Sequence, residues 1–219
     1  MIAITRQERW DDAKRGALIE AAVEECASRG FEGASYNRII ERSGLSKGTV
    51  YYYFDNKESL LCTVMREIFD TLMADILPLD LPDTKELYWE KLGEYHRRGV
   101  DFIMENPLRG RLMLMLSAEE SALSGKIQLL HEQALKEVDD FLLRGQELGA
   151  VRRDLSVVTI RRLMHTVRNV LGFSFFDGWT PQDFRDVSRE KVEELILMML
   201  DLSRRMLTPR EEGNVSGNG

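Results

Sequence analysis

Hydroxyl, phenol and ammonium groups gather between residues 35 and 57, and these are groups that contact a nucleic-acid duplex. Serine, threonine, lysine and tyrosine hydrogen-bond to phosphate oxygens, and hydroxyls and apolar groups also reach base edges in the major groove. A glycine among them lets the backbone approach the duplex closely. The residues expected to contact DNA are Ser35, Asn37, Ser46, Lys47, Gly48, Thr49, Tyr51, Tyr52, Tyr53 and Lys57.

Two short helices joined by a glycine turn are needed to position these side chains. The sequence predicts one helix over about residues 36–42 and a second over about residues 46–53. Gly44 stands between them, where a tight turn requires a positive φ, and Ser46 is a suitable N-cap for the second helix. This arrangement is a helix-turn-helix unit.

The second short helix has two distinct faces. At about 100° per residue, Val50 and Phe54 share one side, and Gly48 and Tyr52 fall on the opposite side. We expect the first pair in the core and the second pair at the bases. The remaining polar residues, Lys57 among them, would mostly contact phosphates.

Longer helices are predicted on both sides of this unit. Upstream, apolar residues recur at helical spacing over about residues 12–29, and Gly30 ends the pattern. Capping boxes are predicted to begin the next two helices, at Asp55 with Glu58 and at Asp83 with Glu86.

Residues 35–60 resemble the tetracycline-repressor-type (TetR) family of transcription regulators. The family pattern Gly-Val/Leu-Ser-x-Gly-Thr-Leu/Val-Tyr-x-x-Phe-x-x-Lys-Glu-x-Leu is matched from Gly44 to Leu60, and the similarity extends upstream over Leu18 to Phe31. Cys26 and Ile40 replace the phenylalanine and alanine that are usual in the family. Both changes alter packing volume and remove no expected DNA contact.

The resemblance implies an all-α fold, with an N-terminal three-helix helix-turn-helix DNA-binding domain and a C-terminal helical ligand-binding and dimerisation domain. Helical periods run through the chain with no persuasive strand, which agrees with this class. We expect the DNA-binding domain in residues 1–56, a connecting helix and linker in 57–82, the effector-binding and dimerisation domain in 83–207, and a disordered tail in 208–219.

Composition places the chain among soluble proteins. Its 219 residues are 43% hydrophobic, and no apolar run approaches the ~18 residues that a membrane helix needs. We expect a cytoplasmic protein with no membrane partner, no secretory signal, and reduced Cys26 and Cys62, with a redox-sensing pair as the alternative.

Net charge does not favour DNA binding by itself. Residues 1–60 contain nine Lys/Arg and ten Asp/Glu, a balance of −1. The placement of Lys14, Arg15, Lys47 and Lys57, with acids turned away, must therefore produce the DNA-binding surface.

The last two predicted helices are apolar on more than one face. In the family these helices pair with their copies across a two-fold axis, so the resemblance implies a homodimer. The alternative is that both are core helices of a monomer. The candidate interface residues are Val157, Ile160, Met164, Val167, Leu171, Leu195, Met199 and Leu202.

The resemblance also implies a pocket for a small-molecule effector. Methionine adapts to apolar ligands of varied shape, aromatic rings add contact area, and a few polar groups would orient the ligand. The alternative for each residue is a place in the core or in a solvated stripe. The candidates are Met113, His165, Arg168, Asn169, Phe173 and Trp179.

Histidine spacing argues against an enzyme. His96, His131 and His165 lie far apart, and neither a Glu-x-x-His nor a His-x-x-x-His pair occurs, so we expect no metal and no cofactor. The sequence predicts a homodimeric, ligand-responsive repressor that binds double-stranded, pseudo-palindromic operator DNA. The alternative is a DNA-binding helical interaction protein without small-molecule regulation.

Overall fold

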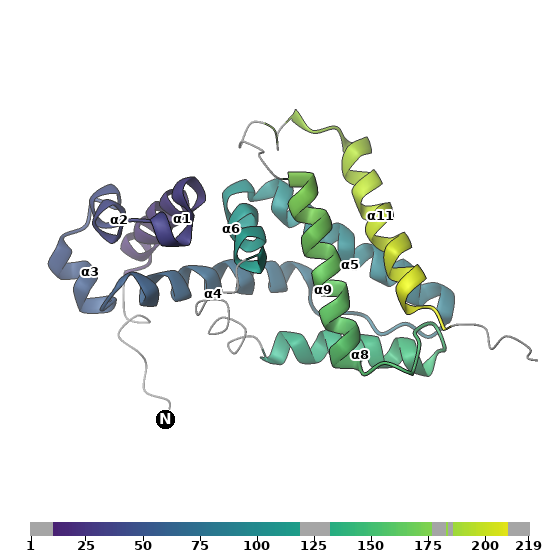
Figure 1. Cartoon of the computed structure of the whole chain (residues 1–219). Coiled ribbons are helices and arrows are strands. Elements are labelled where there is room, and N and C mark those ends of the chain that lie inside the picture. The colour runs from purple at the N-terminus through teal and green to yellow at the C-terminus, as the bar shows by residue number, and fades with distance from the viewer. Residues whose placement is uncertain (1–10, 119–131, 177–182, 184–185, 210–219) are drawn as a thin grey trace, which may run out of the picture. The chain divides into compact units, whose positions relative to one another are not determined.

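The described part of the chain consists of helices and their connections (Figure 1). The computed structural model describes residues 11–118, 132–176, 183 and 186–209, which contain no strand. The predicted all-α class is confirmed, and most of the predicted tail lies outside the described residues. The helices are α1 Asp12–Gly33, α2 Tyr36–Arg42, α3 Lys47–Tyr53, α4 Lys57–Ile76, α5 Lys85–Glu105, α6 Pro107–Ala118, α8 Glu132–Glu147, α9 Val157–Phe176 and α11 Arg189–Leu207.

The chain divides into two compact units that alternate along the sequence. The first unit comprises Met1–Asp75, Asp101–Glu132 and Phe176–Asp186, and the second comprises Ile76–Val100, Gln133–Phe175 and Val187–Gly219. The first unit therefore contains α1 to α4 and α6, and the second contains α8, α9, α11 and most of α5. The functional boundaries predicted at residues 56 and 82 stay predictions.

Local signals set the ends of the two short helices. Ser35 Oγ accepts the backbone N–H of Arg38 at 3.5 Å, and Ser46 Oγ accepts that of Thr49 at 3.1 Å, so each serine caps its helix. Gly44, between the helices, has a φ of 69°. The predicted helix-turn-helix unit is confirmed.

The caps of the two longer helices lie one residue later than predicted. Asn56 Oδ1 accepts the N–H of Ser59 at 2.9 Å before α4. Thr84 Oγ1 accepts the N–H of Leu87 at 3.1 Å before α5. The boxes predicted at Asp55 and Asp83 are corrected to Asn56 and Thr84, because the cap is the residue directly before the first helical turn.

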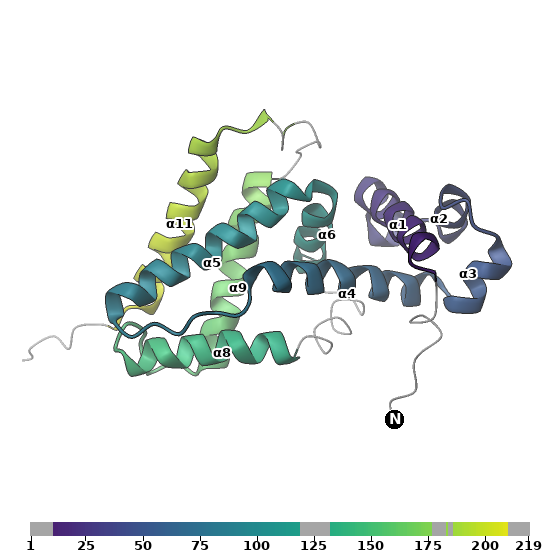
Figure 2. The same cartoon turned by 180° about the vertical axis from the view of Figure 1, so that it is seen from behind.

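The core of the first unit lies where α1 to α4 meet (Figure 2). Apolar side chains from all four helices are almost fully buried there: Leu18, Val23, Ile39, Ile40, Val50, Phe54, Leu60 and Met65. The helix α6 packs against α1, and an ion pair between Arg109 and Glu20 joins them. The apolar faces of α2 and α3 are therefore occupied, which leaves their polar faces toward solvent.

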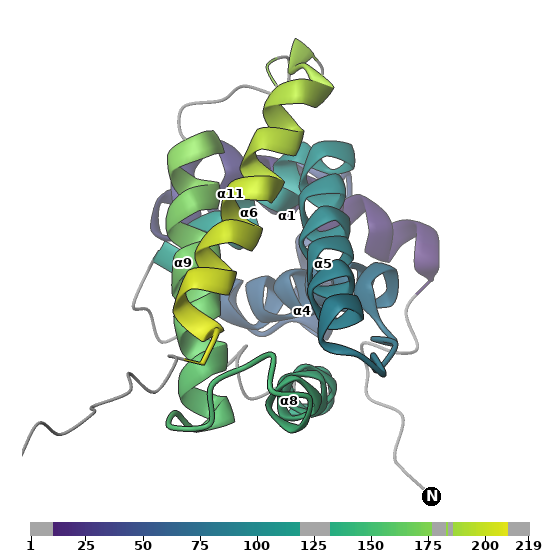
Figure 3. The ribbon, with the colours of Figure 1, turned by 90° about the vertical axis from the view of Figure 1, so that its right-hand side faces the viewer.

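The second unit is built from α5, α8, α9 and α11 (Figure 3). Its core contains Tyr88, Trp89, Leu92, Phe141, Leu142, Ala150, Val151, Ile160 and Leu207. The Tyr88 ring stacks on Phe141 with 4.7 Å between centroids, and Arg161 Nε donates to Asp139 Oδ1 at 2.6 Å between α9 and α8. These contacts pack the four helices around one apolar centre.

Gly145→Ala tests the packing of this core. A Cβ at residue 145 would stand 2.5 Å from Tyr88 Cε2 and 2.7 Å from Val151 Cγ2. We expect the free energy of unfolding in urea to fall by roughly 1–3 kcal/mol, as in other overpacked cores. Gly99→Ala is the control, because its Cβ would meet nothing within 4 Å and alanine favours a helix by about 1 kcal/mol. Equal stability of the two variants would contradict this packing.

Candidate nucleic-acid interface

The outer face of α3 is a polar and aromatic surface on a buried support. Tyr51 and Tyr52 are 47% and 58% exposed, whereas Val50 and Phe54 are buried. Gly48 and Lys47 are exposed. The buried and exposed faces of α3 therefore lie where the spacing of about 100° per residue predicts them. Contacts of the outer face with DNA remain a prediction.

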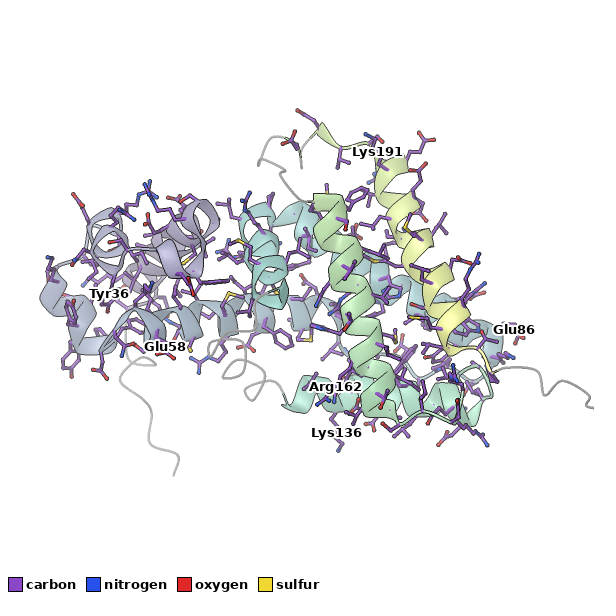
Figure 4. All side chains as sticks on the ribbon, viewed as in Figure 1. Tyr36, Glu58, Glu86, Lys136, Arg162 and Lys191 are labelled. Carbon is purple, nitrogen blue, oxygen red and sulfur yellow. The ribbon has the colours of Figure 1, made fainter. Side chains whose placement is uncertain are left out.

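A tyrosine absent from the sequence prediction orients this surface. Tyr36, at the start of α2, donates its hydroxyl to the Phe54 carbonyl oxygen at 2.7 Å, and its ring meets that of Tyr51 edge-on at 5.3 Å. Burial raises the pKa of Tyr36 to about 12, so the phenol remains a donor. Tyr36 follows the Ser35 cap directly, which is the signal that would have found it (Figure 4).

The two lysines predicted to contact phosphates differ in their surroundings. Lys57 Nζ lies 3.0 Å from each of the carbonyl oxygens of Phe31, Glu32 and Ala34, so it uses its donors at the end of α1. These bonds favour a structural role for Lys57, and its predicted contact with a phosphate stays a prediction. Lys47 is exposed and has no partner among the described residues. Its ammonium ion is available to a phosphate.

The hydroxyl and amide candidates also divide into two groups. Ser46 Oγ and Thr49 Oγ1 are 2.8 Å apart, and both Ser35 and Ser46 serve as caps. Asn37 and Tyr52 are exposed, whereas Tyr53 is half-buried with its ring 5.0 Å from that of Tyr52. Asn37 and Tyr52 therefore project from the surface, while the hydroxyls first stabilise the helices.

Two exposed acids of α1 are paired with arginines. Glu24 pairs with Arg42 at 3.6 Å, and Glu20 pairs with Arg109. Arg15 pairs with Glu67, so it contributes less free charge than the sequence prediction assumed. These pairs remove negative charge that would repel phosphates.

Another acid of α1, Glu25, is buried and joins α1 to α2. Its side chain is 2% exposed, and its Oε1 accepts from Arg38 Nε at 2.7 Å and from the Ser35 N–H at 3.1 Å. Burial by itself would raise the pKa of Glu25, but these hydrogen bonds and the charges of Arg38 and Arg29 lower it below its usual value. The carboxylate stays charged and fixes the cap of α2.

The effector candidates do not form one described group. Met113 lies on α6 in the first unit, whereas His165, Arg168 and Asn169 lie on α9 in the second. Trp179 and the side chain of Phe173 lie outside the described residues. The structure instead joins Arg168 to Tyr95, whose hydroxyl lies 2.9 Å from Nη1, a neighbour that sequence reasoning missed.

The dimer candidates include residues that the single chain already buries. Ile160, Leu195 and Met199 are buried, so they are corrected to core positions of the protomer. Half-buried candidates are Val157, Met164, Val167, Leu171 and Leu202. The strongly exposed apolar residues of α9 and α11 are not among the predicted interface residues. They are Val158, Leu163, Val170, Leu197 and Met198.

The described residues contain neither a metal-type cluster nor a membrane-spanning helix. No group of His, Cys, Asp or Glu there has the arrangement of a metal site. None of the described helices is long and apolar enough to span a bilayer. Cys26 is buried, which raises the pKa of its thiol to about 12, and Cys62 is partly exposed.

The sequence of the first unit matches known regulators. Residues 18–63 match the model of a family described as bacterial regulatory proteins, tetR family. The HTH-type transcriptional regulator RutR of Escherichia coli strain K12 is 31% identical over 110 residues. That alignment covers 50% of this chain and 50% of RutR, so the chain spans about half the length of this relative.

Solved structures match over more of the chain. A tetR family transcription regulator from Shewanella sp. PV-4 has a TM-score of 0.72 at 18% identity and covers 90% of this chain and 99% of its own. The regulator FadR from Bacillus subtilis, in complex with stearoyl-CoA, has a TM-score of 0.68 at 19% identity, with 86% and 96% covered. At these identities the likeness establishes the fold.

Substitutions on α3 and α4 should separate base reading, phosphate contact and structure. We expect Tyr52→Ala to reduce the preference for the duplex selected by the wild type from a random pool. Lys47→Ala should weaken binding to all duplexes alike. It should also reduce the magnitude of the salt slope, which is the slope of log affinity against log salt concentration, by about 1. Fluorescence anisotropy over a salt series measures both quantities.

Lys57→Ala is the matched control for Lys47→Ala. It should lower the free energy of unfolding by roughly 1–3 kcal/mol, because carbonyls lose a charged donor, and leave the salt slope of the folded protein unchanged. A salt slope reduced as much by Lys57→Ala as by Lys47→Ala would contradict the capping role.

Proposed function

We propose that this chain, which belongs to the tetR family of bacterial regulatory proteins, is a ligand-responsive transcriptional repressor. It binds a pseudo-palindromic operator as a homodimer, and a small, largely apolar effector releases it. The family consists of regulators rather than enzymes, so the protein acts by binding.

The outer face of α3 carries this proposal. Gly48 and Tyr52 lie exposed on a helix whose other side is anchored by Val50. Such a helix fits the major groove, with its outward residues at base edges and the adjacent Lys47 at a phosphate. Because Glu25 and Lys57 attach the neighbouring elements to α1, the face enters the groove without rearrangement.

An exposed apolar face on α9 and α11 supports the homodimer. Leu163 and Val170 lie seven residues apart on α9 and are 40% and 59% exposed, while Leu197 and Met198 on α11 are 56% and 51% exposed. Side chains of this kind gain free energy by packing against a second copy. A two-fold dimer requires an operator with two inverted half-sites.

An acyl compound is the effector class to test first. FadR, whose fold this chain shares, was solved with stearoyl-CoA. In this chain α6 carries Met113 and Met115, both half-buried, and methionine adapts to apolar ligands of varied shape. These observations favour a ligand with a long apolar part.

The helix α4 is the element through which effector and operator would be coupled. Its first residue, Lys57, bonds to carbonyls at the end of α1. The helix runs 20 residues to Ile76, about 30 Å at 1.5 Å per residue, and there the chain enters the second unit. Displacement of the far end of α4 would change the distance between the two copies of α3 in the dimer.

A charge on the exposed face of α11 should dissociate the dimer. We expect Leu197→Glu to shift the mass in solution, measured by light scattering, from dimer to monomer, because it places carboxylates in an apolar contact. The same change at Leu143, which is 45% exposed on α8, is the control and should leave the dimer intact. A wild type that is monomeric at micromolar concentration would exclude this interface.

Operator and effector should weaken each other's binding equally. A release of about 100-fold requires about 2.7 kcal/mol of preference for the DNA-incompatible state, and the coupling is reciprocal. Calorimetric titration of a long-chain acyl-CoA, with and without operator, measures it. Equal acyl-CoA affinities in both titrations would favour the alternative of a DNA-binding interaction protein without this regulation. The absence of any acyl-CoA binding would favour the same alternative.

A further inference from the structure

Three hydrogen-bonded pairs of polar side chains lie on α5, α9 and α11 of the second unit, and His165 among them is exposed. They consist of Tyr95 and His96 on α5, His165, Arg168 and Asn169 on α9, and Ser203 on α11. Arg168 Nη1 lies 2.9 Å from the Tyr95 hydroxyl, His96 Nε2 lies 3.3 Å from Ser203 Oγ, and Asn169 Nδ2 lies 3.0 Å from His165 Nδ1. We call these six residues the basic cluster.

His96 is the buried member of the basic cluster. The residue is 4% exposed, and Ser203, which it contacts, is also buried. Ser203 donates its hydroxyl to the Met199 carbonyl oxygen at 2.7 Å, so its oxygen accepts from the Nε2–H of His96. In this neutral tautomer Nδ1 is an acceptor, and it has no hydrogen-bond partner in the structure. A buried acceptor without a donor costs free energy until one is supplied.

Arg168 carries a charge that no acid in the described residues compensates. Its guanidinium is half-buried, and its hydrogen bond goes to a neutral phenol. Two acids of the neighbouring helices have other partners: Asp139 accepts from Arg161 at 2.6 Å, and Glu193 accepts from Arg97 Nη2 at 2.9 Å. A partly buried arginine normally pairs with a carboxylate or a phosphate.

The histidines add no charge near neutral pH. Burial, with the charge of Arg168, lowers the pKa of His96 to about 4. Burial and the charges of Arg168 and Arg161 lower the pKa of His165 to about 4 as well. Arg161, which lies on the same helix, is paired with Asp139, and Arg168 is the member of the basic cluster that carries a positive charge.

We propose that the basic cluster binds the anionic group of the effector, with Arg168 pairing to a carboxylate or phosphate at one end of an apolar chain. This deepens the proposed function and rests on it. A guanidinium can donate two parallel hydrogen bonds to either anion, and the Tyr95 hydroxyl positions it. The neutral His96 lies beside this site and can accept from a donor group that the ligand supplies.

Probes that differ only at the head group test the proposal on the full-length protein. Decanoate, decyl phosphate and decanol share one apolar chain, and calorimetry below their micelle concentrations gives their dissociation constants. We expect an anionic probe to bind about tenfold or more tighter than decanol, the range for a charge-assisted pair. Preference for decanoate would identify a carboxylate ligand, and preference for decyl phosphate would identify a phosphate. Equal binding of all three, or binding of none, would overturn the proposal.

Variants at the cluster assign the preference to Arg168. Arg168→Gln should abolish the preference for the anion, and Arg168→Lys should keep part of it. Arg189→Gln, which removes the same charge from an exposed position at the start of α11, should change nothing. If Arg168→Gln does not fold by circular dichroism, Tyr95→Phe, which removes only the hydroxyl that positions Arg168, should still weaken the preference. An unchanged preference in a folded Arg168→Gln, or in Tyr95→Phe when the first variant is unfolded, would overturn the assignment.

Two further measurements separate this proposal from the proposed function. Decanoate affinity should stay constant between about pH 6 and pH 8, since decanoate stays ionised, the buried His96 stays neutral and Arg161 stays paired. A rise in affinity as the pH falls through this range would show that a histidine carries the charge. Operator affinity without probe should be equal for wild type and the control Arg189→Gln, and it is the second measurement. If the wild type binds no palindromic duplex while the head-group preference persists, the proposed function fails and the anion site stands.

Discussion

The placement of α2 and α3, the helices proposed to face DNA, depends on one buried carboxylate. Glu25 accepts from the side chain of Arg38 and from the backbone N–H of Ser35, so it joins α1 to the first turn of α2. A buried charge is tolerated only when it is hydrogen-bonded, which makes this geometry selective. Lys57 has the complementary role, because its ammonium ion joins α4 to carbonyls at the end of α1. Both ends of the helix-turn-helix unit are therefore attached to the same helix.

Charge pairing explains how a domain without basic excess can present a surface to DNA. Three acids of α1, namely Glu20, Glu24 and Glu25, are paired with arginines, some of them distant in sequence, such as Arg109 with Glu20. The pairs neutralise charge that would otherwise repel phosphates, at the cost of also occupying the arginines. Lys47 is the cation on α3, and it has no ion-pair partner among the described residues. Contact with DNA would thus depend more on the shape of α3 than on long-range attraction.

The second unit uses its apolar residues in two ways. One set, which includes Ile160 and Leu195, is buried in the protomer, and another, which includes Val170 and Leu197, is left exposed on the same helices. Helices that are apolar on most sides need cover on most sides, and the exposed set is the surface that the proposed dimer would cover. Polar residues such as Arg168 interrupt this apolar unit, and they are retained although they cost desolvation.

The sequence by itself determined what depends on neighbours a few residues away: the helical class, the ends of α2 and α3, the turn at Gly44, and the burial of Val50 opposite Gly48. Capping signals were displaced by one residue at α4 and α5, because adjacent polar residues compete for the same role. Only the tertiary structure decided which partners Glu25, Lys57 and Arg168 take and which apolar stripe is buried. Periodicity shows that a helix has an apolar or charged side, but the group that meets that side comes from a distant part of the chain.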